Sequence, residues 1–232
     1  TKQQKELYVG YTQRIRDELD VTIQERGFER GKLQILAGLT RLRQICCHPN
    51  LFVENYGGTS GKLEQLLELV ADLKESGRRA LIFSQFSQML TLLRAKLEAE
   101  GYNVFYLDGT TPSKERMDMS EAFNQGEKDF FLISLKAGGT GLNLTGADTV
   151  ILYDLWWNPA VEEQAAGRAH RIGQKKVVQV IRMISEGTIE EKIYQLQQKK
   201  RELVDQIIQP GETLLSSLSE QEIREIIQLD SE

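Results

Sequence analysis

The chain has 232 residues, of which 40% are hydrophobic and four are proline, enough for one sizeable core and some peripheral helices. It contains no apolar run of about 18 residues, and its N-terminal TKQQKELY lacks the apolar stretch of a signal peptide, so we expect no membrane segment. The net charge of -5 argues against a uniformly basic, nucleic-acid-binding domain.

The acidity is concentrated near the C-terminus. From Ser185 onward the chain carries eleven acidic and five basic residues, whereas residues 1–184 carry 23 acidic and 24 basic ones. Between Gln164 and Arg182 there are five lysines and arginines and no acidic residue. The sequence therefore predicts a local basic patch on an acidic chain.

Apolar residues at helical spacing predict two helices at the start of the chain, in Lys2–Gln24 and Lys32–Cys47. Pro49 and the run NYGGTSG end this helical segment, which places a boundary near Gly58.

Two cysteines and a histidine stand together at Cys46, Cys47 and His48. Adjacent cysteines rarely form a disulfide with each other, so we expect buried free thiols in a reducing, intracellular compartment. Because the other histidine of the chain is the distant His170, the four ligands of a zinc site are lacking and no metal is predicted.

The run GGTSGK at 57–62 resembles the end of a Walker A loop, which binds the phosphates of ATP. The first glycine of that motif would fall on Tyr56, and Leu63 replaces the serine or threonine that ligates magnesium. We therefore interpret the run as the start of a helix with Ser60 as its N-cap.

Beyond this boundary, short apolar runs alternate with helical stretches. The runs typical of strands are Ala80–Phe83, Val104–Leu107, Phe130–Leu135, Val150–Tyr153 and Val177–Met183. The helical stretches are Lys62–Glu75, Ser87–Glu100, Pro112–Asn124 and Ala160–His170. This alternation predicts an α/β fold, a parallel sheet flanked by helices, which binds its ligands at the carboxyl ends of the strands.

A long polar helix is expected at Thr188–Gln209, ended by Pro210 and Gly211, and a capping box at Ser219 and Glu222 predicts a shorter helix after it. We divide the chain into a helical segment at 1–58, an α/β lobe at 59–184 and a C-terminal helix and tail at 185–232.

The loop Lys136–Gly141 (KAGGTG) follows a predicted strand, and its glycines would let backbone N–H groups approach a phosphate. A simple tight turn is the alternative. A dinucleotide-binding GxGxxG pattern fails, because Leu144 or Asn143 stands where that pattern needs glycine.

Gln164, Arg168 and Arg171 are spaced to share one face of the predicted helix, with small residues between them. Two guanidinium groups projecting together suit a polyphosphate, since each offers a rigid fork of donors. A solvated basic face is the alternative, but no acidic residue alternates with these bases and Gly167 calls for a packing reason.

Two adjacent tryptophans follow a predicted strand in the segment 154–159 (DLWWNP). They cannot both occupy one buried face, so we expect one indole to face a cleft, where it could pack on a sugar or base. A position in the core or an interface is the alternative.

These features together resemble the second motor lobe of the Swi/Snf-type family, DNA-translocating ATPases related to superfamily 2 helicases. Six stretches occur in the family's order over nearly the whole chain: TRLRQICCHPNL, SGKLEQLLELV, ALIFSQFSQML, YLDGTTPSKERMDMSEAFN, ISLKAGGTGLNLTGADTVILYDLWWNP and QAAGRAHRIGQ. The resemblance implies a RecA-like lobe with extra N- and C-terminal helices. It favours a bacterial or archaeal, cytoplasmic protein, or a nuclear one if the source is eukaryotic.

The resemblance also implies roles for individual residues. Arg168 and Arg171 would be arginine fingers that reach ATP and magnesium held mainly by a first lobe. Gln164, Gly139 and Gly141 would lie near the same phosphates. The residues expected along duplex DNA are Ser84, Gln85, Gly109, Thr110, Lys136, Thr140, Asn143 and Trp157, in contacts that are largely blind to base sequence.

A complete motor needs a Walker A lysine and a DEAH-type acidic motif, and residues 1–232 contain neither. We therefore interpret the chain as one lobe of a two-lobed motor. Its expected partners are duplex DNA, the first lobe of the same polypeptide and a DNA-bound protein. Alone, it is expected to hydrolyse no ATP. The rival interpretation is a DNA-binding or regulatory module without ATPase function, and a nucleotide-dependent oxidoreductase is disfavoured by the missing glycine pattern.

Overall fold

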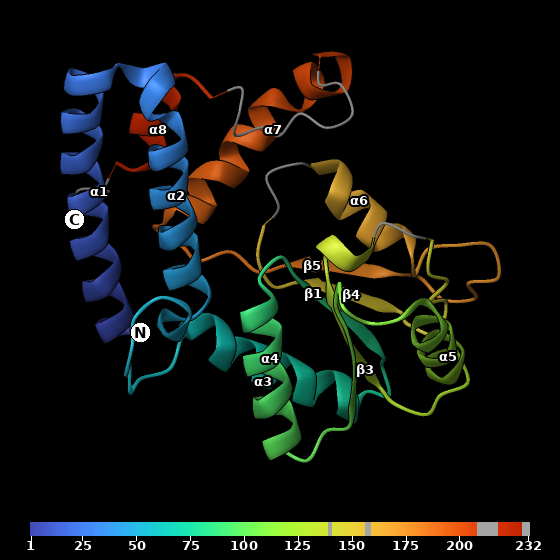
Figure 1. Cartoon of the computed structure of the whole chain (residues 1–232). Helices are drawn as coiled ribbons and strands as arrows, with labels where there is room; N and C mark the ends of the chain where they lie inside the picture. Colours follow the sequence, from blue (N-terminus) through green and yellow to red (C-terminus); the bar gives the residue numbers. More distant parts are fainter. Residues whose placement is uncertain (139–140, 156–158, 208–217, 229–232) are drawn as a thin grey trace. The chain divides into compact units, whose positions relative to one another are not determined.

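The computed structural model describes residues 1–138, 141–155, 159–207 and 218–228 (Figure 1). The chain forms two compact units, one made of Thr1–Gly61 together with Ile184–Glu232, and the other of Lys62–Met183. Each unit has buried hydrophobic residues of its own. Among the described residues, no helix combines the length and apolarity needed to cross a membrane.

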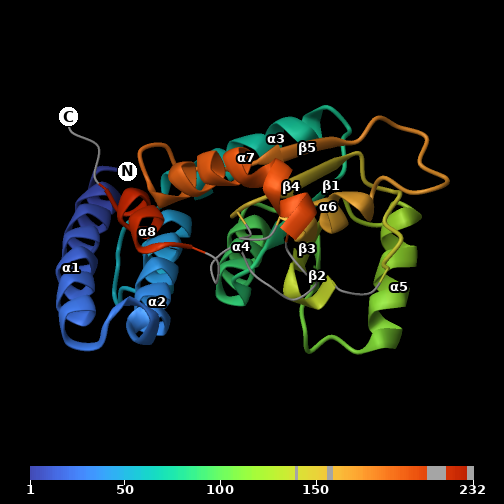
Figure 2. The same cartoon turned by 90° about the horizontal axis from the view of Figure 1, so that it is seen from above.

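The first unit is helical, and its two longest helices lie side by side in both views (Figures 1 and 2). Helix α1 spans Lys2–Arg26 and α2 spans Phe28–Cys47, which confirms the two helices expected there. They approach closely because Gly31 and Gly38 of α2 face Thr22 and Ile15 of α1, where an added Cβ would lie 2.2 and 3.3 Å from the facing methyl carbons. Both cysteines at the end of α2 are buried thiols that are not joined in a disulfide, as expected.

The C-terminal helices belong to the same unit. Helix α7 spans Ile189–Ile207, and its first backbone N–H donates to the Tyr8 hydroxyl at 2.7 Å. Helix α8 spans Glu220–Ile226 and begins with the predicted capping box of Ser219 and Glu222. Ile223 and Ile226 of α8 are buried, and Arg224 pairs with Asp20 of α1 at 2.8 Å.

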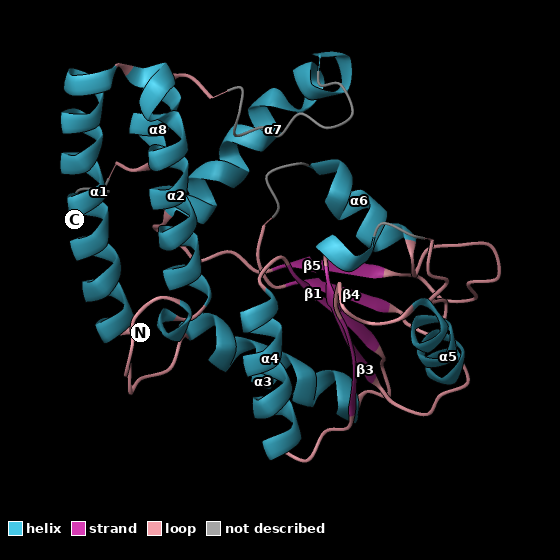
Figure 3. Cartoon of the chain, viewed as in Figure 1, coloured by secondary structure: helices cyan, strands magenta, loops and turns pink. Residues whose placement is uncertain are grey.

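The second unit is a five-stranded, fully parallel sheet with helices on both faces, so the α/β prediction is confirmed (Figure 3). Its strands are β1 (Ala80–Ser84), β2 (Val104–Leu107), β3 (Phe130–Ser134), β4 (Thr149–Leu152) and β5 (Gln179–Arg182), in the order β2-β3-β1-β4-β5. The central strands β1, β3 and β4 are wholly buried, which explains their continuous apolar sequences.

The helices of this unit are α3 (Gly61–Glu75), α4 (Ser87–Ala99), α5 (Ser113–Asn124) and α6 (Pro159–Gly167), with a short 3-10 helix η2 at Lys136–Gly138. Helix α3 begins where the GGTSGK run was expected to start a helix. Helices α4 and α5 lie on opposite sides of the strands (Figure 2), as right-handed crossovers require.

One face of the sheet carries the residues of interest. Phe123 of α5, Ala165 of α6, and Leu142 and Leu144 of the long segment between β3 and β4 pack in a single cluster with Phe83 and its neighbours on the strands. No helix longer than η2 is present in the described part of this β3–β4 crossover. The crossover loop, defined here as residues 141–148, therefore lies on the same face as α5 and α6.

Candidate functional site

The carboxyl ends of β1 and β4 are joined by a buried carboxylate. Ser84 donates its hydroxyl to Asp154, and the backbone N–H of Gln85 donates to the other oxygen of Asp154 at 3.1 Å. Both Ser84 and Asp154 are fully buried. The Ser84 hydroxyl therefore does not reach the surface of the chain and instead holds Asp154.

Gln85, the next residue expected to contact DNA, is half-buried. Its side-chain nitrogen is shielded from solvent and has no hydrogen-bond partner among the described residues. Of the other expected contacts, Gly139, Thr140 and Trp157 lie outside the described residues.

The turn after β2 is organised by Asp108. The backbone N–H and the hydroxyl of Thr110 donate to the same carboxylate oxygen at 2.8 and 2.6 Å, and the Tyr106 hydroxyl donates to the other at 3.0 Å. The pKa of Asp108 lies below its ordinary value, mainly because the Thr110 hydroxyl donates a hydrogen bond to the carboxylate. Gly109 and Thr110 are exposed at the tip of this turn.

Arg116 on α5 connects this turn to the segment after β3. Its guanidinium donates to the carbonyl oxygens of Thr111 at 2.8 Å, Ala137 at 2.7 Å and Asp108 at 3.2 Å. The exposed Lys136 stands beside Ala137 on η2. Two segments expected to contact DNA are thus joined by a residue that sequence reasoning missed, since an arginine in a polar helix carries no signal of such a role.

The crossover loop is fastened by Asn124, another residue that sequence reasoning missed. The Asn124 side chain donates to the carbonyl oxygen of Asn143 at 2.8 Å and accepts from the N–H of Gly146 at 2.9 Å. Arg79 donates to the Gly146 carbonyl at 2.9 Å. The loop therefore presents the exposed Gly141 and Asn143 on a backbone that other elements hold in place.

The arginine segment differs from the prediction. Helix α6 ends at Gly167, so the expectation of a helix continuing to His170 is wrong. Gln164 is exposed on the helix, whereas Arg168 and Arg171 lie in the turns that follow it and do not share a helical face with Gln164. The Arg168 carbonyl accepts from the N–H of Leu144 at 2.9 Å, a contact to the crossover loop that replaces continued helical pairing.

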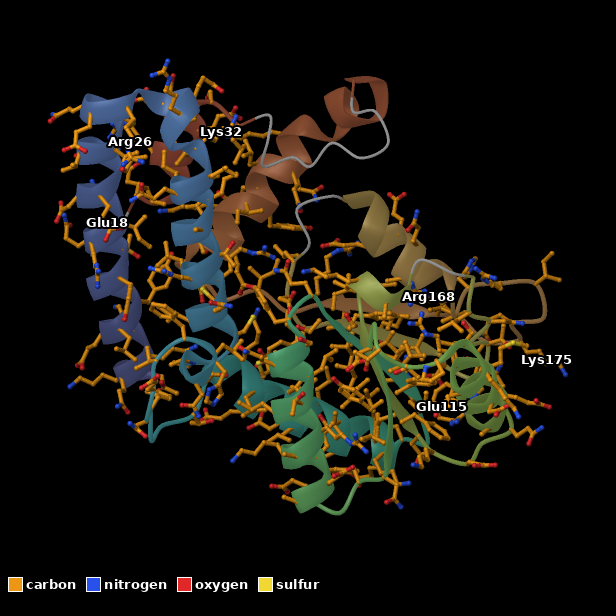
Figure 4. All side chains as sticks on the ribbon, in the orientation of Figure 1. Glu18, Arg26, Lys32, Glu115, Arg168 and Lys175 are labelled. Atoms are coloured by element: carbon orange, nitrogen blue, oxygen red, sulfur yellow. The ribbon has the colours of Figure 1, made fainter. Side chains whose placement is uncertain are left out.

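Arg168 is a buried cation beside other cations. Its side chain is 4% exposed, and its guanidinium lies 5.3 Å from the centre of the Phe83 ring. Burial first, and then the charges of Arg171 and Arg116, lower the pKa of Arg168 to about 10. Figure 4 shows Arg168 near the end of α6.

Arg171, by contrast, is exposed, and its guanidinium donates to the carbonyl oxygen of Gly141 at 3.0 Å. Arg116, Arg168 and Arg171 are close enough for their charges to interact. The arrangement can bind a polyphosphate, because it combines several rigid donors with a local excess of positive charge. Within the described residues, no three His, Cys, Asp or Glu side chains are grouped so that they could hold a metal ion.

Comparison with known proteins shows which family the chain resembles. The family model described as "Helicase conserved C-terminal domain" matches residues 61–173. The chain is 45% identical to the putative ATP-dependent helicase/translocase YwqA of Bacillus subtilis, over 95% of the chain and 24% of that protein. It is 41% identical to the human SWI/SNF-related matrix-associated actin-dependent regulator of chromatin subfamily A member 1, over 91% of the chain and 21% of that protein. The chain thus spans only a fraction of the length of these relatives.

Solved structures show the same similarity. The C-terminal domain of the Sulfolobus solfataricus SWI2/SNF2 ATPase superposes with a TM-score of 0.80 and 35% identity, covering 100% of this chain and 95% of that domain. The core of the same ATPase in complex with dsDNA superposes with a TM-score of 0.82 and 35% identity, covering 100% of this chain and 48% of that one.

Proposed function

The chain belongs to the Swi2/Snf2 family as the RecA-like, C-terminal lobe of its ATPase, and from this premise we propose that it is half of a DNA-dependent motor. In this proposal a first lobe holds ATP and magnesium, and this lobe completes the catalytic site. The whole motor translocates on duplex DNA and remodels protein–DNA complexes.

The observation that carries the proposal is the burial of Arg168 among cations. Burial of the Arg168 guanidinium, which is 4% exposed, and the nearby charges of Arg171 and Arg116 all disfavour its charged form. A polyphosphate brought by another lobe would relieve this repulsion. Charge that develops on the transferred phosphoryl group during hydrolysis would then be neutralised by donors already in place.

The other proposed nucleotide contacts lie close to these arginines in the sequence or in space. Arg171 donates to the carbonyl oxygen of Gly141, and the exposed Gln164 lies on α6, four residues before Arg168 in the sequence. Gly139 completes the proposed set. ATP would supply the phosphoryl group that is transferred. We assign its magnesium ion to the first lobe, because residues 1–232 lack the Walker A and DEAH-type motifs.

Duplex DNA is proposed as the track of the motor because the similar Sulfolobus ATPase core was solved with dsDNA. The exposed residues Gly109, Thr110 and Lys136 follow the neighbouring strands β2 and β3, so they share one edge of the sheet. Asn143 is exposed on the crossover loop. Backbone contacts by such residues would be independent of base sequence. Gln85, Thr140 and Trp157 stay in the proposed set, and Ser84 acts only by holding Asp154.

The proposal is tested by replacing Arg168 in the full-length protein. We expect Arg168→Ala to lower DNA-stimulated ATP hydrolysis by at least about 10³-fold, as for the loss of other arginine fingers. Arg168→Met, which keeps most of the buried volume, should do the same. Affinity for duplex DNA should change by less than about twofold, because the Arg168 side chain is buried and is not among the proposed DNA contacts.

Lys175→Ala is the matched control, since Lys175 is an exposed cation of the same segment with no proposed role. It should retain wild-type turnover. Near-normal hydrolysis by Arg168→Ala would refute the arginine role.

A further inference from the structure

The side-chain amide of Gln174 joins the arginine segment to the crossover loop. Its nitrogen lies 3.0 Å from the carbonyl oxygen of Thr145, 2.8 Å from that of Ala147 and 2.9 Å from that of Ala169. Its oxygen accepts from the N–H of Lys176 at 3.0 Å. Both ends of this half-buried amide are therefore engaged with backbone groups.

The segment that Gln174 holds is not stabilised as a helix. Arg168 and Arg171 follow the end of α6 and lie in turns. Gly173 has a φ of 100°, a left-handed conformation that favours glycine, and it directs the chain so that Gln174 faces back toward Ala169. The backbone N–H of Gln174 donates to the Arg171 carbonyl at 3.0 Å.

The partner that Gln174 contacts is itself well held. Leu144 and Ala147 of the crossover loop are buried, and Asn124 of α5 bonds the loop on either side of Leu144. The loop also contacts both arginines directly, through the Leu144 N–H to the Arg168 carbonyl and through the Arg171 guanidinium to the Gly141 carbonyl. Gln174 thus links Ala169, which lies between Arg168 and Arg171 in the sequence, to the crossover loop.

We propose that Gln174 is a positioning residue for Arg168 and Arg171. It acts through the backbone of Ala169 and does not itself touch the nucleotide. Phosphoryl transfer depends on donors placed to within a fraction of an ångström, so a small movement of this segment would reduce the rate without changing which residues are present. The proposal rests on the proposed ATPase function.

The test is Gln174→Glu in the full-length protein. Glutamate has the same shape as glutamine, but a carboxylate oxygen takes the place of the side-chain nitrogen. The carbonyl oxygens of Thr145, Ala147 and Ala169 would then face a carboxylate oxygen and lose their N–H donor. We expect kcat for DNA-stimulated ATP hydrolysis to fall by at least about tenfold. KM for ATP and Kd for duplex DNA should stay within about twofold of wild type, since the first lobe and the DNA contacts are unchanged.

Gln179→Glu is the matched control, because it adds the same charge nearby on β5, where the exposed Gln179 accepts from Arg78 at 2.7 Å. It should keep wild-type kcat. A second readout compares binding of ADP with binding of ADP plus aluminium fluoride, a mimic of the transferring phosphoryl group. Gln174→Glu should weaken the mimic by at least about tenfold and leave ADP unchanged.

Wild-type kcat in Gln174→Glu would overturn the positioning role. So would a loss of kcat matched by an equal loss of folded protein and DNA affinity, which a purely structural residue would produce. If Arg168→Ala is inactive while Gln174→Glu is normal, only this inference fails. If Arg168→Ala keeps its turnover, the proposed function fails first and takes this role with it.

Discussion

Asp108 illustrates how one side chain shapes a loop of the site. Its carboxylate accepts from the N–H and hydroxyl of Thr110 and from the Tyr106 hydroxyl, and these bonds lower its pKa, with the Thr110 hydroxyl contributing most. Because the folded pKa lies below the unfolded one, the stabilisation is fully present above the unfolded pKa. It is lost as pH falls through the folded pKa.

Removal of the Thr110 hydroxyl should therefore raise the pKa of Asp108. We expect the pKa of Asp108 in Thr110→Val to lie nearer the ordinary value for aspartate. An NMR titration that follows the chemical shift of the Asp108 carboxyl carbon measures this pKa. The stability difference from wild type should vanish once the pH is below both pKa values. Thr111→Val is the control, because the Thr111 hydroxyl accepts from the Asp108 N–H rather than donating to its carboxylate. An unchanged pKa in Thr110→Val would contradict this account.

At the scale of elements, Tyr8 links the first and the long C-terminal helix of the helical unit. The phenol is 7% exposed and accepts from the N–H of Ile189, the first residue of α7, at 2.7 Å. Burial raises the pKa of Tyr8, so the hydroxyl stays protonated at neutral pH. The start of α7 thus depends on an acceptor far away in sequence.

Tyr8→Phe should lower the free energy of unfolding by about 1–2 kcal/mol, since it leaves a buried N–H without its acceptor. Urea denaturation of the chain measures the change. Tyr11→Phe serves as comparison, because the Tyr11 ring packs edge-on against Phe52 at 4.9 Å and phenylalanine keeps that contact. Equal stabilities of Tyr8→Phe and wild type would show that the hydrogen bond is not important.

The end of α6 shows where element-level prediction stops. Apolar and small residues continue at helical spacing up to His170, but the helix ends at Gly167. Glycine weakens a helix, and the next carbonyl, that of Arg168, pairs with Leu144 from the crossover loop. The helix boundary is thus decided by a contact to another part of the chain.

At the scale of the whole molecule, the α/β unit lies between the two parts of the helical unit along the chain. Residues 1–232 carry the arginines but neither the Walker A lysine nor the DEAH-type motif. We therefore expect the isolated chain to hydrolyse no measurable ATP, with or without duplex DNA. Addition of a Walker A lobe from the same family as a separate polypeptide should restore DNA-stimulated turnover.

Turnover in that mixture should disappear with Arg168→Ala, which checks that the arginine is supplied in trans. Measurable ATP hydrolysis by the isolated chain would contradict the proposal that a first lobe holds ATP and this lobe supplies the arginines. Tight duplex binding by the isolated chain, with no turnover in the mixture, would instead favour a DNA-binding module.

The sequence by itself determined the alternation of strands and helices, the capping box at Ser219 and the family motifs. These are local features, because the hydrophobic pattern of a strand or helix and the capping residues of a helix lie within the segment itself. Only the tertiary structure decided the strand order, the burial of Ser84 and Arg168, and the contacts of Arg116 and Gln174. The physical reason is that these side chains bond to backbone carbonyls or carboxylates of distant segments, and no local pattern encodes which distant segment will be there.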